Sequence, residues 1–294
     1  MTDTSQRNRS IMSGIAIVIG VVMMAVIPFL VQTSLERVLV NLMEHVKTHP
    51  AFSSGLKLFD FFYPVWRALI FTAGATLIVT SQQVRKGETW AYSLAMVCFA
   101  LPAIGGMFMF LPYVSWVPGF PLPIVISMIG LAGFWSFILL RAGSRMEKLA
   151  RLGALTFIGM LGTHAFTVGV GAQRTMWTRP GYPLYEGFEW WLFNWAGEVN
   201  WVSFILLFAS IPMLAIGIRR GWWLAVIAAV TILSINIPTQ FFRTKTLDWL
   251  YGSLLAAGVL IFTVVPYFKR HLLAEPLTEE EEVAGPETGM PAAV

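Results

Sequence analysis

Polar and ionisable side chains lie within or beside long apolar stretches of this sequence, where such groups are expensive and usually functional. They are Arg67, His164, Glu198, Asn236, Gln240, Arg243 and Asp248. An imidazole can transfer a proton, a guanidinium can hold an anion, and amides and carboxylates can hydrogen-bond a polar ligand. We therefore predict that this set contributes to a ligand-binding site. The sequence assigns no residue a catalytic role.

Each residue of the set also has a purely structural interpretation. Arg67 can extend to the membrane surface, and Glu198 can interact with the positive end of a helix. His164 can donate to a carbonyl inside a helix bundle. Asn236 and Gln240 lie one helical turn apart and can hydrogen-bond a neighbouring helix. All of these residues share one side of the membrane in the topology predicted below, which favours a common site.

Several cofactor chemistries lack their ligands in the sequence. A zinc site needs three or four ligands, and no HExxH motif or Cys/His cluster is present. Only His164 lies inside a predicted span, so a bis-histidine haem is not expected. The single cysteine, Cys98, excludes an internal disulfide. We expect no metal, no evident cofactor and, because the basic residues are scattered, no nucleic-acid partner.

The elements that must position these side chains are transmembrane helices. Hydrophobic residues make up 56% of the 294-residue chain and charged residues 12%, about half the share in soluble domains. The mean hydropathy is +0.69. Apolar runs long enough to cross a bilayer occur at 11–33, 61–81, 90–112, 121–141, 149–171, 199–218, 222–242 and 247–268. The sequence therefore predicts an all-α polytopic membrane helix bundle of about eight spans.

The distribution of basic residues predicts the orientation of these spans. With the N-terminus inside, twelve Lys and Arg residues flank the cytoplasmic ends and eight flank the outer ends. The inside set is Arg7, Arg9, Arg85, Lys86, Arg141, Arg145, Lys148, Arg151, Arg219, Arg220, Lys269 and Arg270. An even number of spans places both termini in the cytoplasm. We predict a multi-pass protein of the plasma (inner) membrane, with the lipid bilayer as its main partner.

Regions outside the spans complete the predicted organisation. Residues 1–10 form a cytoplasmic segment, 11–272 form the transmembrane domain, and the acidic tail 273–294 is expected to be disordered. Residues 34–49 carry apolar side chains at helical spacing, which predicts an amphipathic helix on the outer surface, capped by Ser34 and ended before Pro50. Within an outer loop, 172–198, the aromatic stretch from Glu186 to Trp195 is interpreted as a separate interfacial segment.

In this topology the polar set lies in the outer half of the membrane, which indicates a pocket open to the outer face. Three functions fit such a pocket. The first is binding or transport of a small solute or lipid. The second is a membrane anchor in a larger redox complex, with a quinone in the pocket and partner subunits docked on the aromatic loop. The third is an outer-leaflet enzyme with His164 as base beside Glu198, or beside Arg67 as an anion clamp.

Overall fold

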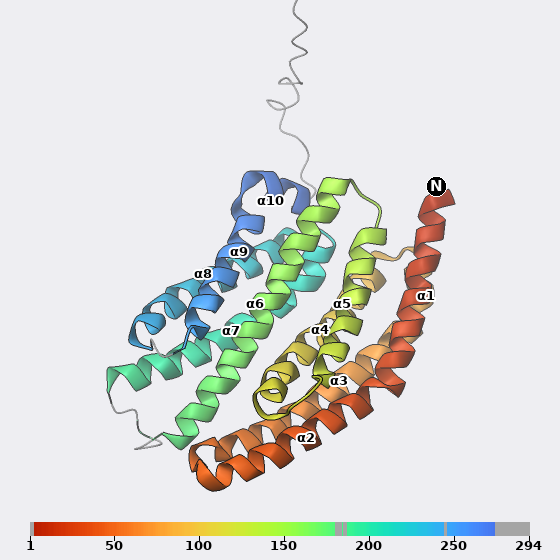
Figure 1. Cartoon of the computed structure of the whole chain (residues 1–294). Coiled ribbons are helices and arrows are strands. Elements are labelled where there is room, and N and C mark those ends of the chain that lie inside the picture. The colour runs from red at the N-terminus through yellow and green to blue at the C-terminus, as the bar shows by residue number, and fades with distance from the viewer. Residues whose placement is uncertain (1–2, 180–183, 185–186, 244–245, 274–294) are drawn as a thin grey trace, which may run out of the picture.

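The computed structural model describes residues 3–179, 184, 187–243 and 246–273, and this part of the chain is helical with short connections (Figure 1). In chain order the helices are α1 (Asp3–Ala25), α2 (Ile27–Thr48), the short 3-10 helix η1 (Pro50–Phe52), α3 (Ser53–Lys86), α4 (Thr89–Trp116), α5 (Leu122–Leu140), α6 (Arg145–Thr178), α7 (Phe188–Ala215), α8 (Arg219–Phe242), α9 (Asp248–Val264) and α10 (Pro266–Leu273). Because every backbone polar group must be satisfied within the bilayer, helices are the expected solution for so apolar a chain.

The number of spans confirms the predicted polytopic bundle. Among the described residues, seven helical segments are long and apolar enough to cross a membrane, with α1 and α2 forming one of them. The number rises to eight when α9 and α10, which are bent by 71° at their junction, are counted as one span. The bend falls at Pro266, which has no backbone N–H to continue the hydrogen-bond ladder of α9. Within the predicted span 247–268, the straight helix α9 therefore ends at Val264.

The predicted surface helix 34–49 is not a separate element. Helix α2 already begins at Ile27, and Ser34 lies in its middle, where the hydroxyl donates to the Leu30 carbonyl at 2.6 Å. The predicted cap at Ser34 is therefore wrong, although the end before Pro50 is confirmed. The chain breaks at Val26 instead because Pro28 fits the first turn of a new helix. The apolar face of α2 packs along α3.

The expected outer loop 172–198 is mostly helical. Helix α6 continues to Thr178, and α7 begins at Phe188 and runs unbroken to Ala215. The aromatic stretch thus forms the first turns of α7, while Glu186 lies outside the described residues. The break before α7 falls at Gly187, whose φ of 84° suits glycine. Leu192 and Phe193 are buried, so packing of one face extends this helix beyond its most apolar part.

The basic residues predicted to face the cytoplasm all lie at one end of the bundle, here called the basic end. Asn8 of α1 donates to the Leu140 carbonyl at 3.2 Å, and Arg9 donates to the Lys86 carbonyl at 3.2 Å. The first residues of α1 and the whole of α10 lie at this same end (top of Figure 1). Residues 3–10, expected as a segment outside the helices, already belong to α1. The predicted disordered tail, 273–294, lies outside the described residues except for Leu273.

Candidate functional site

A cavity of about 720 Å³ lies against α6, with its other walls contributed by α4, α5, α7, α9 and the α8–α9 connection. We call it the α6 groove. Its lining residues on α6 run from Leu155 to Thr175. At a rise of 1.5 Å per residue this is a length of about 30 Å, which matches the thickness of the hydrocarbon core of a bilayer.

The groove exists because α5 packs against α4 and leaves space beside α6. A Cβ atom at Gly130 of α5 would lie 2.5 Å from the backbone nitrogen of Ala103, so the two backbones are in close contact there. On α6 the situation is the opposite. A Cβ atom at Gly159 or Gly171 would meet no atom within 4 Å. The cavity thus lies between the closely packed pair α4 and α5 and the open glycine positions of α6.

The middle of the groove is apolar and opens sideways. Lining side chains in this part include Ala100, Ile104, Met107, Leu111, Leu131, Phe134 and Met160. Leu111 is 42% exposed and Met160 is 48% exposed, although both line the cavity. The bundle therefore does not fully enclose the groove.

Charged side chains line the end of the groove opposite the basic end. Arg243 lies at the end of α8, with its Nη1 atom 3.5 Å from Glu189 Oε1 and its Cζ atom 4.0 Å from the Phe193 ring centroid. Arg174, on the last turns of α6, places its Cζ atom 4.9 Å from the Phe52 ring centroid. Asp248 begins α9, where the positive end of the helix favours a carboxylate.

His164 lies halfway along the groove and packs against α9. Asp248, at the start of α9, is close enough to contribute to the electrostatic environment of the imidazole. A Cβ atom at Gly252 would lie 2.7 Å from His164 Cε1 and 2.4 Å from Asn236 Nδ2, so only glycine permits these two side chains to approach α9 together. Within the described residues, His164 Nδ1 and Asn236 Nδ2 are buried without a hydrogen-bond partner.

The structure brings three of the seven predicted residues to the groove wall, namely His164, Arg243 and Asp248. Asn236 lies behind the wall, where its side-chain oxygen accepts from Asn200 at 2.9 Å. Gln240 donates to the Thr246 carbonyl at 2.8 Å and so holds the α8–α9 connection.

The remaining two predicted residues, Arg67 and Glu198, do not line the groove. Arg67 donates to the side chain of Gln32 on α2, and Glu198 accepts from Asn194 one turn earlier on α7. Arg174 lines the groove but was absent from the predicted set. A detectable signal was its place on the helical face that also carries Thr163, Thr167 and Gly171.

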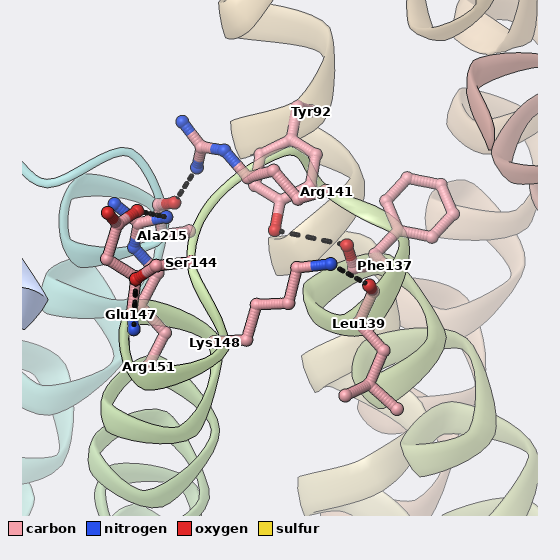
Figure 2. Close-up of polar contacts among 9 residues, drawn as sticks. All are labelled: Tyr92, Phe137, Leu139, Arg141, Ser144, Glu147, Lys148, Arg151 and Ala215. Atoms are coloured by element: carbon pink, nitrogen blue, oxygen red, sulfur yellow. Dashed lines mark hydrogen bonds and ion pairs between the residues drawn. The ribbon is translucent and has the colours of Figure 1, made fainter. Parts of the chain in front are cut away.

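A cluster of polar contacts lies at the basic end, beyond the last lining residue of α6, Leu155 (Figure 2). The guanidinium of Arg141 donates to the Ala215 carbonyl and stacks on Tyr92, with its Cζ atom 4.5 Å from the ring centroid. Arg151, one helical turn beyond Leu155 on the same face of α6, is only 6% exposed. These contacts join the α5–α6 connection to the end of α7.

The comparisons add no relative to this picture: family profiles, curated proteins and solved structures all return no match to the chain. No group of three or more His, Cys, Asp or Glu side chains capable of holding a metal ion occurs within the described ranges. What the described arrangement offers chemically is a long apolar cavity with guanidinium groups, a carboxylate and hydroxyl groups toward one end.

Proposed function

We propose that the protein binds a long-chain lipid in the α6 groove, taking it up sideways from the bilayer. The observation that carries this proposal is the match between the groove and such a ligand: a cavity about 30 Å long, apolar along its middle and exposed at Leu111 and Met160. Binding or transport of a solute or lipid was the first function favoured by the sequence, and the length and apolar lining of the groove support a lipid as the ligand.

The apolar lining argues against a hydrated solute. A polar molecule passing Met107, Leu131 and Phe134 would lose its water without gaining hydrogen bonds, which is unfavourable. A hydrocarbon chain has no hydrogen bonds to water to lose when it enters the same space. The polar end of a lipid would then lie near Arg174 and Arg243, where the membrane meets water. In the predicted orientation, this end faces the outer leaflet.

The two other functions have less support from the geometry. The enzyme hypothesis paired His164 with Glu198 or Arg67, and both of these residues are bonded elsewhere. A quinone with a long tail remains an occupant that the same cavity could take, since Trp135 and Phe134 line it. An absorption spectrum of the purified protein separates a quinone from other lipids.

The proposal is tested by native mass spectrometry of the protein purified in mild detergent. We expect one lipid-sized adduct on the wild-type protein. Leu131→Trp fills the middle of the groove and should remove it. Val79→Trp is the matched control, because Val79 is 79% exposed on α3 and does not line the groove. A wild-type protein without an adduct, or equal retention by both variants, would refute binding in the groove.

A further inference from the structure

We infer that the lipid bound in the groove carries an anionic group, a phosphate or a carboxylate, and that Arg174 is the residue that binds it. The inference rests on the proposed function, since it names the chemical class of the ligand for the same groove. It also assigns a specificity-determining role to a residue outside the set of seven predicted from the sequence.

Arg174 is held in position by the start of α3 and by η1. Its guanidinium lies over the Phe52 ring at 4.9 Å, and its backbone carbonyl accepts from the Ser54 hydroxyl at 3.0 Å. A Cβ atom at Gly55 would lie 3.5 Å from Arg174 Cδ, so the aliphatic part of the side chain runs directly along α3. Arg174, which lines the groove, is therefore held against α3 and η1 and does not extend freely into solvent.

The charge of Arg174 has no counter-ion among the described residues. Its only recorded side-chain charge contact is with the Phe52 ring, and no described carboxylate lies within 4.0 Å of its guanidinium. A half-buried guanidinium lining a cavity can donate two parallel hydrogen bonds to a phosphate or carboxylate. The missing counter-ion is thus supplied by the ligand.

The other charged groups of the groove do not compete for this role. The charge of Arg243 is offset by Glu189 at 3.5 Å. Asp248 is itself a carboxylate, so it cannot bind an anion. It is the one carboxylate among the described lining residues of the groove.

The test is a competition between lipid classes. The detergent-purified protein is exchanged into nanodiscs containing equal amounts of phosphatidylcholine, phosphatidylglycerol and a long-chain fatty acid, and the lipid retained on release is identified by native mass spectrometry. We expect one anionic lipid to be enriched about ten-fold over phosphatidylcholine, the size expected for a hydrogen bond to a charged group. Enrichment of phosphatidylglycerol indicates a phosphate ligand, and enrichment of the fatty acid indicates a carboxylate.

Two variants and one control test whether Arg174 causes the preference for an anionic lipid. Arg174→Gln should still retain lipid but lose the enrichment, and Arg174→Lys should keep part of it. Arg67→Gln makes the same charge change at a residue outside the groove and should behave as wild type. Wild-type protein that retains lipid without an anionic preference would overturn the inference and leave lipid binding intact, whether or not the variants fold. Enrichment that survives in Arg174→Gln would also overturn it, and absence of any lipid would refute both proposals.

Discussion

The side-chain amide of Asn200 donates to the side-chain oxygen of Asn236 at 2.9 Å, and neither residue is exposed. This bond joins α7 to α8 directly behind the groove wall. Asn200 also donates to the Ala196 carbonyl of its own helix at 2.8 Å, so both amide hydrogens are used. Asn236 therefore acts as an acceptor in the interior of the bundle, while its own Nδ2 has no partner within the described residues.

Asn236→Ala should destabilise the protein by about 1–2 kcal/mol, because it leaves an Asn200 amide hydrogen buried without an acceptor. Ser234→Ala is the control on the same helix. Ser234 is exposed and donates only to the Val230 carbonyl, so its loss should change stability by less than about 0.5 kcal/mol. Unfolding in a mild detergent titrated with SDS measures both. Equal stability of the two variants would contradict the assigned role of the Asn200–Asn236 bond.

Gly252→Ala should lower stability by about 1–3 kcal/mol, since the added methyl group overlaps Asn236 and His164 in a packed interior. The matched control is Gly14→Ala on α1, where a Cβ atom meets nothing within 4 Å. That variant should be neutral or slightly stabilising. The same SDS titration compares them, and a Gly252→Ala protein as stable as Gly14→Ala would show that His164 and Asn236 do not pack against α9 as described.

Single introduced cysteines test the proposed orientation of the basic end toward the cytoplasm. The native Cys98 is only 3% exposed and should remain unlabelled by a membrane-impermeant maleimide. Ser115 lies at the end of α4 away from the basic end, and Ala142 follows α5 at the basic end; both are exposed. We expect Ser115→Cys to be labelled in intact cells and Ala142→Cys only after permeabilisation. The reverse pattern would invert the topology and place the open end of the groove in the inner leaflet.

Glu147→Ala should destabilise the basic end more than Arg151→Met does. Arg151 is buried, and Glu147, at 3.9 Å, is its only recorded carboxylate partner in the described chain. Removing Glu147 leaves a buried cation unpaired, at a cost of about 1–3 kcal/mol, whereas methionine replaces that cation with an apolar chain of similar length.

The double variant Glu147→Ala/Arg151→Met should therefore be more stable than Glu147→Ala alone, which a thermal unfolding cycle in detergent can measure. If the two single effects simply add, the ion pair does not contribute at this site.

Local properties of the sequence account for the parts of the fold that were predicted correctly. Hydropathy over about 20 residues indicates a span whatever its neighbours, because the bilayer is a uniform apolar solvent. Hydropathy predicted the helix bounds wrongly where tertiary packing determines them. Leu192 and Phe193 are buried against the bundle, so α7 continues through residues that hydropathy placed in a loop. Ser34 likewise lies inside α2, because the break at Val26 precedes it.

By itself, the sequence determined that this chain is a helical membrane bundle and which helix ends carry the basic residues, since both follow from composition along the chain. Only the tertiary structure decided which polar residues share a site. His164, Arg243 and Asp248 line the groove, and Arg67 and Glu198 do not. The sequence alone predicted all five as ligand-binding residues. The physical reason is that the contact of Gly130 with Ala103 places α5 on α4, and this long-range packing opens the cavity along α6.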